Sequence, residues 1–277
     1  MVLQRVVTLA AVAALLAGCA GTRDVTGTAH DPEFIVNGAP AGSEYPSVGA
    51  LLFDYNRDGV LDGDDEWCTG SLISPTVFLT AAHCIRTPYT PPGSQFYVSF
   101  APDLYAHNIK VIAATGTTVD PAYGHDMANL HDLAVVFLPA NATRGMTPLS
   151  LPPAGYLDQL AAQGGLTDQL FVNVGYGTSS TLTGPPGFPY DGTKKVSKSE
   201  FMGLQPTWLG LLMNQHATGE GGDCYGDSGG PKFLDGNPNV IVATVTTGDY
   251  PCRATTWDWR LDTPEARGFL ATYVTLP

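Results

Sequence analysis

Short apolar runs separated by turn residues recur along most of the chain. The runs are rich in β-branched and aromatic residues, and Gly, Pro, Asn and Asp cluster between them. Many short strands with frequent turns are typical of a β-barrel or a β-sandwich, so the pattern predicts an all-β fold. The strands are expected within residues 47–53, 71–74, 76–80, 95–100, 108–116, 133–138, 170–177 and 239–247.

Only the C-terminus carries a helical pattern. Thr263 offers an N-cap, Pro264 suits a first turn, and Glu265 lies near the positive end of the helix dipole, ahead of the segment ARGFLATYV. Earlier in the chain, the proline-rich stretch Thr147–Pro153 is a plausible boundary between two halves.

The N-terminus is predicted to be a targeting segment. A positive charge at Arg5 precedes an apolar run that is too short and too early for a spanning helix, so residues 1–18 are interpreted as a signal peptide. The sequence LAGC, which ends at Cys19, resembles a bacterial lipoprotein box, and that resemblance implies lipidation of Cys19. Ordinary secretory cleavage near Ala17 or Ala20 is the alternative, and both predict export.

Composition narrows the classes of partner. Of 277 residues, 44% are hydrophobic, and 32 Gly and 22 Pro suit a folded, turn-rich protein. The formal charge of −13 argues against nucleic acid or anionic lipid as a partner, because phosphates select basic surfaces. The membrane is therefore expected to be reached only through a lipid at Cys19, after which residues 19–34 would form a tether or pro-segment.

The other cysteines predict disulfide bonds. Apart from Cys19, the chain contains Cys68, Cys84, Cys224 and Cys252, an even number in an exported protein. Four cysteines allow three pairings. A metal cluster is disfavoured, because no C-x-x-C pair occurs and the histidines are scattered.

Acidic residues crowd the segment Asp54–Glu66. Its spacing matches the calcium loop D-x-[DN]-x-[DN]-G of EF-hands, with Gly59 at the sharp turn, and also resembles loops of the dockerin type. EF-hands usually end in a bidentate Glu, whereas this loop ends in an Asp, and no helices are expected beside it. We predict a structural calcium site, with a solvated acidic turn as the alternative. The oxygen ligands would come from Asp54, Asn56, Asp58, the Val60 carbonyl, Asp62 and Asp65.

Three motifs carry the candidate chemistry: TAAHC at 80–84, HDLAV at 131–135 and CYGDSGGP at 224–231. A serine hydroxyl is too weak an acid to attack an amide unaided, so a neutral imidazole must take its proton. His83 is the candidate base, Ser228 the nucleophile, and Asp132 would hold the imidazole in the correct tautomer. Each residue alone could be structural, but the three motifs together make that alternative weak.

These motifs, together with IVNG at Ile35–Gly38, resemble the chymotrypsin-like serine peptidases in the order His, Asp, Ser. The resemblance covers residues 35–277. It implies an all-β fold of two packed six-stranded antiparallel β-barrels with a C-terminal helix, the barrels at about residues 35–150 and 151–277. It also implies a monomeric serine endopeptidase that needs no organic cofactor, with Gly226 and Ser228 donating N–H groups to the oxyanion.

The resemblance implies two further pairings. Among the cysteines, it pairs Cys68 with Cys84 and Cys224 with Cys252. In this family, cleavage before the Ile-Val-x-Gly motif frees an amino group that pairs with the Asp before the nucleophile. The pair here would be Ile35 and Asp227, and its formation would order the oxyanion hole. Phe34 precedes Ile35, so an activating peptidase of trypsin-like specificity is not expected.

The specificity pocket departs from the trypsin pattern. By resemblance its floor would be Gly222 followed by Asp223, and its walls Thr246, Thr247 and Gly248. A floor without charge predicts an apolar or medium-sized side chain, as in chymotrypsin-like members. The alternative is that Asp223 reaches a basic side chain, which would give a trypsin-like preference.

Three functional hypotheses follow. The leading one is an exported peptidase acting on proteins or peptides. A catalytically silent binding protein on the same scaffold is disfavoured, because the triad and the oxyanion-hole glycine are present. A calcium-dependent adhesion module would explain the acidic loop but leave the triad unexplained.

Overall fold

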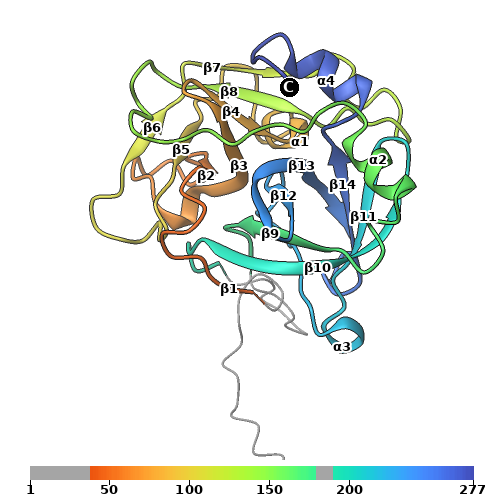
Figure 1. Cartoon of the computed structure of the whole chain (residues 1–277). Coiled ribbons are helices and arrows are strands. Elements are labelled where there is room, and N and C mark those ends of the chain that lie inside the picture. Colours follow the sequence, from red (N-terminus) through yellow and green to blue (C-terminus); the bar gives the residue numbers. More distant parts are fainter. Residues whose placement is uncertain (1–37, 179–189) are drawn as a thin grey trace, which may run out of the picture. The chain divides into compact units, whose positions relative to one another are not determined.

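The computed structural model describes residues 38–178 and 190–277. The signal peptide, the lipidation site Cys19 and the activation residue Ile35 therefore lie outside the described residues. No helix in the described part is both long and apolar enough to cross a membrane. The strands form two antiparallel sheets, coloured mainly orange to green and green to blue in Figure 1.

The first sheet is a half-barrel built from residues before position 138. Its apolar side chains fill one core, which includes Leu51, Leu72, Phe78 and Val136. The two edge strands each pair with one neighbour only, so the ladder stays open between them. In order across the sheet the strands are β6 (Val111–Ala113), β5 (Tyr97–Ser99), β2 (Val48–Leu52), β3 (Glu66–Ser74), β4 (Val77–Thr80), β8 (Ala134–Phe137) and β7 (Gly116–Val119).

The second sheet closes into a six-stranded barrel. Closure comes from the strand at residues 170–175, which pairs with strands on both of its sides. The short strand β1 (Ala39–Pro40) adds to the edge of β10, so a segment from before the first sheet joins the second. The barrel strands are β9 (Leu170–Gly175), β10 (Lys195–Leu204), β11 (Trp208–Leu212), β14 (Thr255–Arg260), β13 (Asn237–Gly248) and β12 (Pro231–Leu234).

The predicted all-β, chymotrypsin-like fold class is confirmed, with few helices. One detail differs from the expected two six-stranded barrels: the second sheet closes into one, whereas the first is an open half-barrel. One hydrophobic core joins the two sheets. It contains Val48, Leu79 and Val135 from the first sheet and Val172, Phe233 and Trp259 from the second. This shared core fixes the two sheets against each other and thereby sets the geometry of the cavity between them.

The helices are short. The predicted C-terminal helix is present as α4 (Pro264–Leu270), and the Thr263 side chain accepts the Ala266 N–H as its cap. The expectation that only the C-terminus is helical is wrong, because α2 spans Tyr156–Ala162. That helix starts after Gly155 with no side-chain cap, so the usual start signal is missing. The remaining helices are the single turns η1 (Gly63–Asp65), α1 (Ala82–Ile85) and α3 (Gln215–Thr218).

Candidate active site

A cavity of about 670 Å³ lies between the two sheets. His83 on α1 and Ser228 on the loop before β12 both line it. Residues of the acidic loop and residues around the Cys224–Cys252 disulfide also line it. The cavity is thus the place where the sequence motifs of both halves of the chain meet.

The strand register brings His83 to Asp132. Thr80 at the end of β4 pairs with Ala134 at the start of β8, so the residues just beyond both ends lie together. The His83 Nδ1 atom is 2.7 Å from Asp132 Oδ2, and the His83 backbone N–H donates to Asp132 Oδ1 at 2.9 Å. Asp132 is fully buried, whereas the His83 side chain is 33% exposed. The acid is therefore fixed from two sides, and the imidazole stays open to the cavity.

The pKa of His83 is raised above its ordinary value. Burial alone would lower it, but the charge of Asp132 and the hydrogen bond to that carboxylate outweigh the burial. Asp132 thus favours the protonated imidazole, which is the form a general base reaches after taking a proton.

The loop that carries Ser228 is held by the first sheet. The Thr69 hydroxyl on β3 donates to the Gly226 carbonyl at 2.9 Å, and the Thr69 N–H donates to the Ser228 carbonyl at the same distance. Gly226 has φ +97°, a conformation that L side chains rarely adopt. No acceptor among the described residues takes the N–H groups of Gly226 and Ser228, so both are free for a ligand oxygen.

Asp227 lies beneath this loop and is buried. Its carboxylate accepts N–H groups from Gly177 and Cys224, both at 2.8 Å. A Cβ at Gly177 would lie 2.3 Å from Asp227 Oδ2, so this position leaves room only for glycine. Burial, with a contribution from the Asp223 charge, raises the pKa of Asp227 to about 7. A cation beside it, such as a chain-terminal ammonium, would reverse that shift.

Glu66 is a buried acid that the sequence did not single out. It lines the cavity next to Gly226, and neither carboxylate oxygen has a hydrogen-bond partner within the described residues. Burial raises its pKa well above the ordinary value, and the Asp227 charge adds to this, although Lys195 lowers it. The only sequence signal was its place at the end of the acidic segment, where it was grouped with surface acids.

The contribution of Glu66 to the free energy of unfolding should therefore fall as pH rises above the ordinary glutamate pKa toward the raised pKa of Glu66. The folded chain holds the Glu66 proton more tightly than the unfolded chain, so this stabilisation is present below the ordinary pKa and is lost above the raised one. Each pKa unit of increase corresponds to about 1.4 kcal/mol, or roughly 2 to 4 °C in melting temperature. Glu66→Gln should flatten the dependence of melting temperature on pH, while Glu44→Gln, at an exposed site, should not. Equal slopes for wild type and Glu66→Gln would contradict the assignment.

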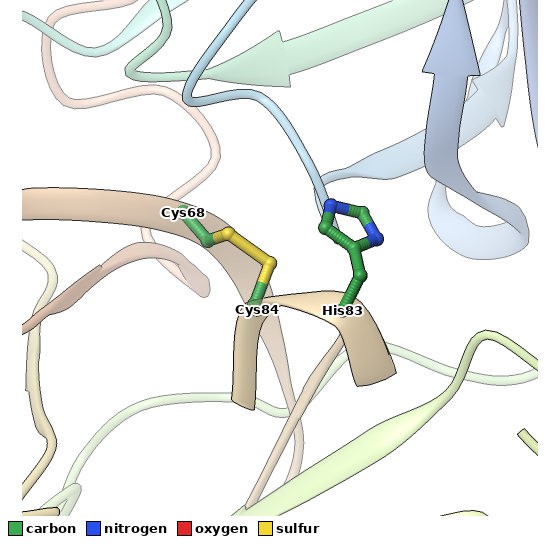
Figure 2. A group of neighbouring side chains, drawn as sticks. All are labelled: Cys68, His83 and Cys84. Carbon is green, nitrogen blue, oxygen red and sulfur yellow. A yellow bond between two sulfur atoms is a disulfide. The ribbon is translucent and has the colours of Figure 1, made fainter. Parts of the chain in front are cut away.

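Both disulfides implied by the family resemblance are present, Cys68–Cys84 and Cys224–Cys252. Figure 2 shows that the first ties β3 to α1, and that the His83 ring projects away from it. Although Cys68, Cys84 and His83 lie close together, the two sulfurs are bonded to each other and offer no thiolate to a metal. The disulfide braces the turn that carries His83.

The predicted specificity-pocket residues gather at one end of the cavity. Asp223, Thr246, Thr247 and Gly248 line it, whereas Gly222 packs behind them. A Cβ at Gly222 would lie 2.3 Å from the Met213 Cβ atom, so Met213 occupies the space of a floor side chain. Asp223 contacts Lys232, which is completely buried. Sequence reasoning missed Met213 and Lys232, because neither lies in a motif.

Residues of the acidic loop also line the cavity. Carboxylate oxygens of Asp54, Asp58 and Asp65 lie within 4.8 Å of one another. Asp65 is 1% exposed and its Oδ1 atom has no partner in the described chain. Burial and the Asp54 charge raise the pKa of Asp65, although backbone hydrogen bonds oppose this.

The other predicted ligands shape the acidic loop. Asp58 accepts the Val60 N–H at 2.8 Å, and the Asp58 N–H donates to the Asn56 side chain at 2.9 Å. The Asp62 side chain accepts the Asp64 N–H at the start of η1. Asp62 is thus used as a helix cap and is not among the three clustered carboxylates.

The sheet arrangement defines the class of protein: an all-β protein with the chymotrypsin-like fold. Among solved structures, human heparin binding protein matches with a TM-score of 0.62 at 18% identity. That match covers 88% of this chain and 99% of the other. At this identity the likeness concerns the fold alone.

Sequence comparison gives the family. The family model described as Trypsin matches residues 41–257. Brachyurin from Leptuca pugilator is 30% identical over 73% of this chain and 82% of its own length. Glucanase inhibitor protein 4 from Phytophthora infestans is 28% identical over 75% of this chain and 78% of its own length. The chain therefore belongs to the trypsin family of serine peptidases, and the family supports a peptidase function on peptide or protein substrates.

Proposed function

We propose that this chain is an exported serine endopeptidase in which Ser228, His83 and Asp132 form the catalytic triad. The observation that carries the proposal is the His83–Asp132 pair, held at 2.7 Å, opening into the same cavity as Ser228. Support also comes from the two unused N–H groups at Gly226 and Ser228, because donors with no acceptor of their own suit a developing oxyanion.

The proposed reaction proceeds through an acyl-enzyme. The Ser228 oxygen attacks the peptide carbonyl carbon while its proton passes to His83 Nε2, and the carbonyl oxygen becomes an oxyanion held by the two N–H groups. The C–N bond then breaks, and His83 gives its proton to the leaving amine. A water molecule next transfers a proton to His83 and attacks the ester, which releases the carboxyl product and restores the Ser228 hydroxyl.

Hydrolysis of an unfolded protein such as casein tests this proposal. Purified protein that begins at Ile35 should hydrolyse casein, and a serine-directed fluorophosphonate should block the reaction. Matured, folded protein that neither hydrolyses casein nor reacts with the fluorophosphonate would contradict the proposal.

A binding protein without catalytic activity is the second candidate. It is favoured by two relatives, a heparin binding protein and a glucanase inhibitor protein. The net charge of −13 disfavours an anionic polysaccharide such as heparin as a ligand for this chain. The geometry of His83 and Asp132 needs no catalysis to form, so the fluorophosphonate reaction decides between the two candidates.

We further propose a structural calcium ion in the acidic loop. The three clustered carboxylates and the unpartnered, buried Asp65 oxygen fit a hard divalent cation, since calcium prefers oxygen ligands. Asp54, Asp58 and Asp65 would hold it, with Asn56, the Val60 carbonyl and Asp62 as the remaining predicted ligands. Tyr55 of the same loop stacks on Trp67 with ring centroids 6.1 Å apart, and both line the cavity. An ordered loop would therefore stabilise one wall of the cavity.

Calcium should raise the melting temperature. At a concentration about 100-fold above Kd, mass action adds about 2.7 kcal/mol, which is roughly 5 to 10 °C for a chain of this size. Asp58→Ala should abolish the increase. Asp64→Asn removes a charge from the same loop, outside the three clustered carboxylates, and should keep it. Identical melting in calcium and in EDTA, in wild type and Asp58→Ala alike, would contradict a bound ion.

Export is supported by the two disulfides, which form and persist in oxidising compartments. We propose that Cys19 is lipidated and that cleavage before Ile35 both activates the enzyme and releases it from its anchor. The basis is sequence alone: LAGC and IVNG are close neighbours, and no cysteine in residues 20–34 could keep the fragment attached. An active species that still begins at a lipidated Cys19 would contradict this proposal.

A further inference from the structure

An ion network lies inside the closed barrel, and one of its members, Asp223, lines the predicted specificity pocket. At its centre is Lys232 on β12, whose side chain has no solvent exposure. Its ammonium group contacts the Asp223 carboxylate, donates to Asn173 Oδ1 at 2.6 Å, and lies 3.7 Å from Asp258 Oδ1. A buried ammonium is costly unless it is paired and hydrogen-bonded, and these three contacts meet that need.

Neighbouring side chains fix this network in place. The Asn173 amide donates to the hydroxyls of Ser197 and Ser199, both at 2.9 Å, so its oxygen must face Lys232. The Thr256 hydroxyl donates to Asp258 Oδ1 at 3.1 Å. Because the partners are themselves anchored, Lys232 cannot turn toward solvent without leaving them unpaired.

Of the two carboxylates near Lys232, Asp223 is the closer partner. Burial raises the pKa of Asp258 to about 8 even though Lys232 lowers it, and the Asp223 charge adds to the increase. The geometry pairs the Lys232 ammonium with Asp223, whose carboxylate it contacts, whereas Asp258 Oδ1 lies 3.7 Å away. Asp223 is the member of this pair that lines the cavity.

The rest of the pocket end is apolar. Met213, Cys224 and Cys252 form one buried cluster, and all three line the cavity. Met213 also fills the space in front of Gly222, so the floor exposes a thioether and a disulfide. Among the described residues near this floor, Asp249 also lines the cavity, but its carboxylate accepts the N–H groups of Arg253, Ala254 and Thr255. Asp223 is the carboxylate that Lys232 contacts.

We propose that Lys232 is a specificity-determining residue: by holding the Asp223 charge from behind, it makes the pocket accept neutral, mainly apolar side chains and reject Arg and Lys. The inference rests on the proposed peptidase function and assigns the substrate class of that site. A basic substrate side chain would have to compete with a resident ammonium for the same carboxylate and would bring a second positive charge into a buried site.

Replacing Lys232 by Met tests the proposal by gain of function. Without the resident ammonium, Asp223 becomes an uncompensated carboxylate at the end of a cavity, and a substrate cation can take its place. The ratio of kcat/KM for an Arg substrate to that for a Leu substrate should rise roughly 10-fold to 100-fold, the range of one charge-assisted hydrogen bond. Lys198→Met removes an exposed lysine from the same barrel and should leave the ratio unchanged.

A binding experiment keeps the inference separate from catalysis. Benzamidine, an aryl amidinium, should stabilise Lys232→Met against heat far more than it stabilises wild type, whether or not either protein cleaves peptides. Because Lys232→Met could unfold through two unpaired acids, Lys232→Met/Asp258→Asn leaves only Asp223 charged and should show the same benzamidine effect. Wild type that prefers Arg or Lys, or folded variants that gain neither benzamidine binding nor Arg cleavage, would overturn the proposal. If wild type cleaves no peptide but the variants gain benzamidine binding, only the proposed peptidase function is contradicted.

Discussion

Replacing Asp132 by Asn should lower kcat about 10⁴-fold, the size of effect that follows when the triad histidine is held in the wrong tautomer. Asp132 accepts from His83 through both the ring and the backbone N–H. An Asn amide can still accept the backbone N–H, so the turn should remain folded. The NH₂ group of that Asn would face the His83 Nδ1 atom, however, so Nδ1 would have to accept a hydrogen bond. The imidazole proton would then lie on Nε2, which must be unprotonated for His83 to act as the base.

The pH profile distinguishes this role from simple structural damage. In wild type, kcat/KM should rise with pH through a pKa above the ordinary histidine value, because Asp132 raises the pKa of His83. In Asp132→Asn the charge of Asp132 is missing, so burial lowers the pKa of His83. The rise of the residual activity with pH should therefore occur at lower pH than in wild type. Asp120→Asn changes the carboxylate beside His131 and should alter kcat less than about 10-fold. Asp132→Asn retaining most of the activity would contradict the assignment.

Cleavage between Phe34 and Ile35 should raise kcat/KM by at least about 10³-fold, because each oxyanion-hole donor contributes about 10² to 10³. Asp227 lies under the loop that carries both donors, and burial raises its pKa to about 7. A buried acid in this position is stabilised by a nearby ammonium, and the new amino group of Ile35 is the proposed source.

A controlled cut tests this prediction. An enteropeptidase site in place of residues 30–34 allows cleavage at Ile35 alone, and activity is measured before and after the cut. A matched chain with one extra Gly before Ile35 should stay inactive, because its ammonium is displaced by one residue. Asp227→Asn should remove most of the gain. Equal activity in cut and uncut protein would contradict the mechanism of activation.

The positions of the candidate site could be predicted from the sequence because the motifs are local. TAAHC and HDLAV each end or begin a strand, and the pairing of Thr80 with Ala134 then places His83 beside Asp132. The disulfide partners followed from resemblance rather than from spacing, which left three pairings open. The acidic loop was visible as a spacing of acids that predicts calcium binding, although Asp62 proves to cap η1.

Three of the strands that the sequence missed, β10, β12 and β14, share one physical cause. In β10 the inward residues are Lys195, Ser197 and Ser199, all buried, so the strand reverses the usual alternation of apolar inside and polar outside. Lys232 on β12 and Asp258 on β14 are likewise polar and buried. Hydrophobic periodicity cannot find a barrel whose interior holds an ion network. The network around Lys232 is also the one that bears on specificity. Its members come from different strands, so it could be recognised only in the structure.

The most direct test of the central claim is to locate a fluorophosphonate adduct on the mature protein by peptide mass spectrometry. The account predicts one adduct per chain, on Ser228 in the peptide CYGDSGGP, and none in Ser228→Ala or after heat denaturation. An adduct on another residue, or no adduct on folded protein that begins at Ile35, would contradict the assignment of Ser228 as the nucleophile.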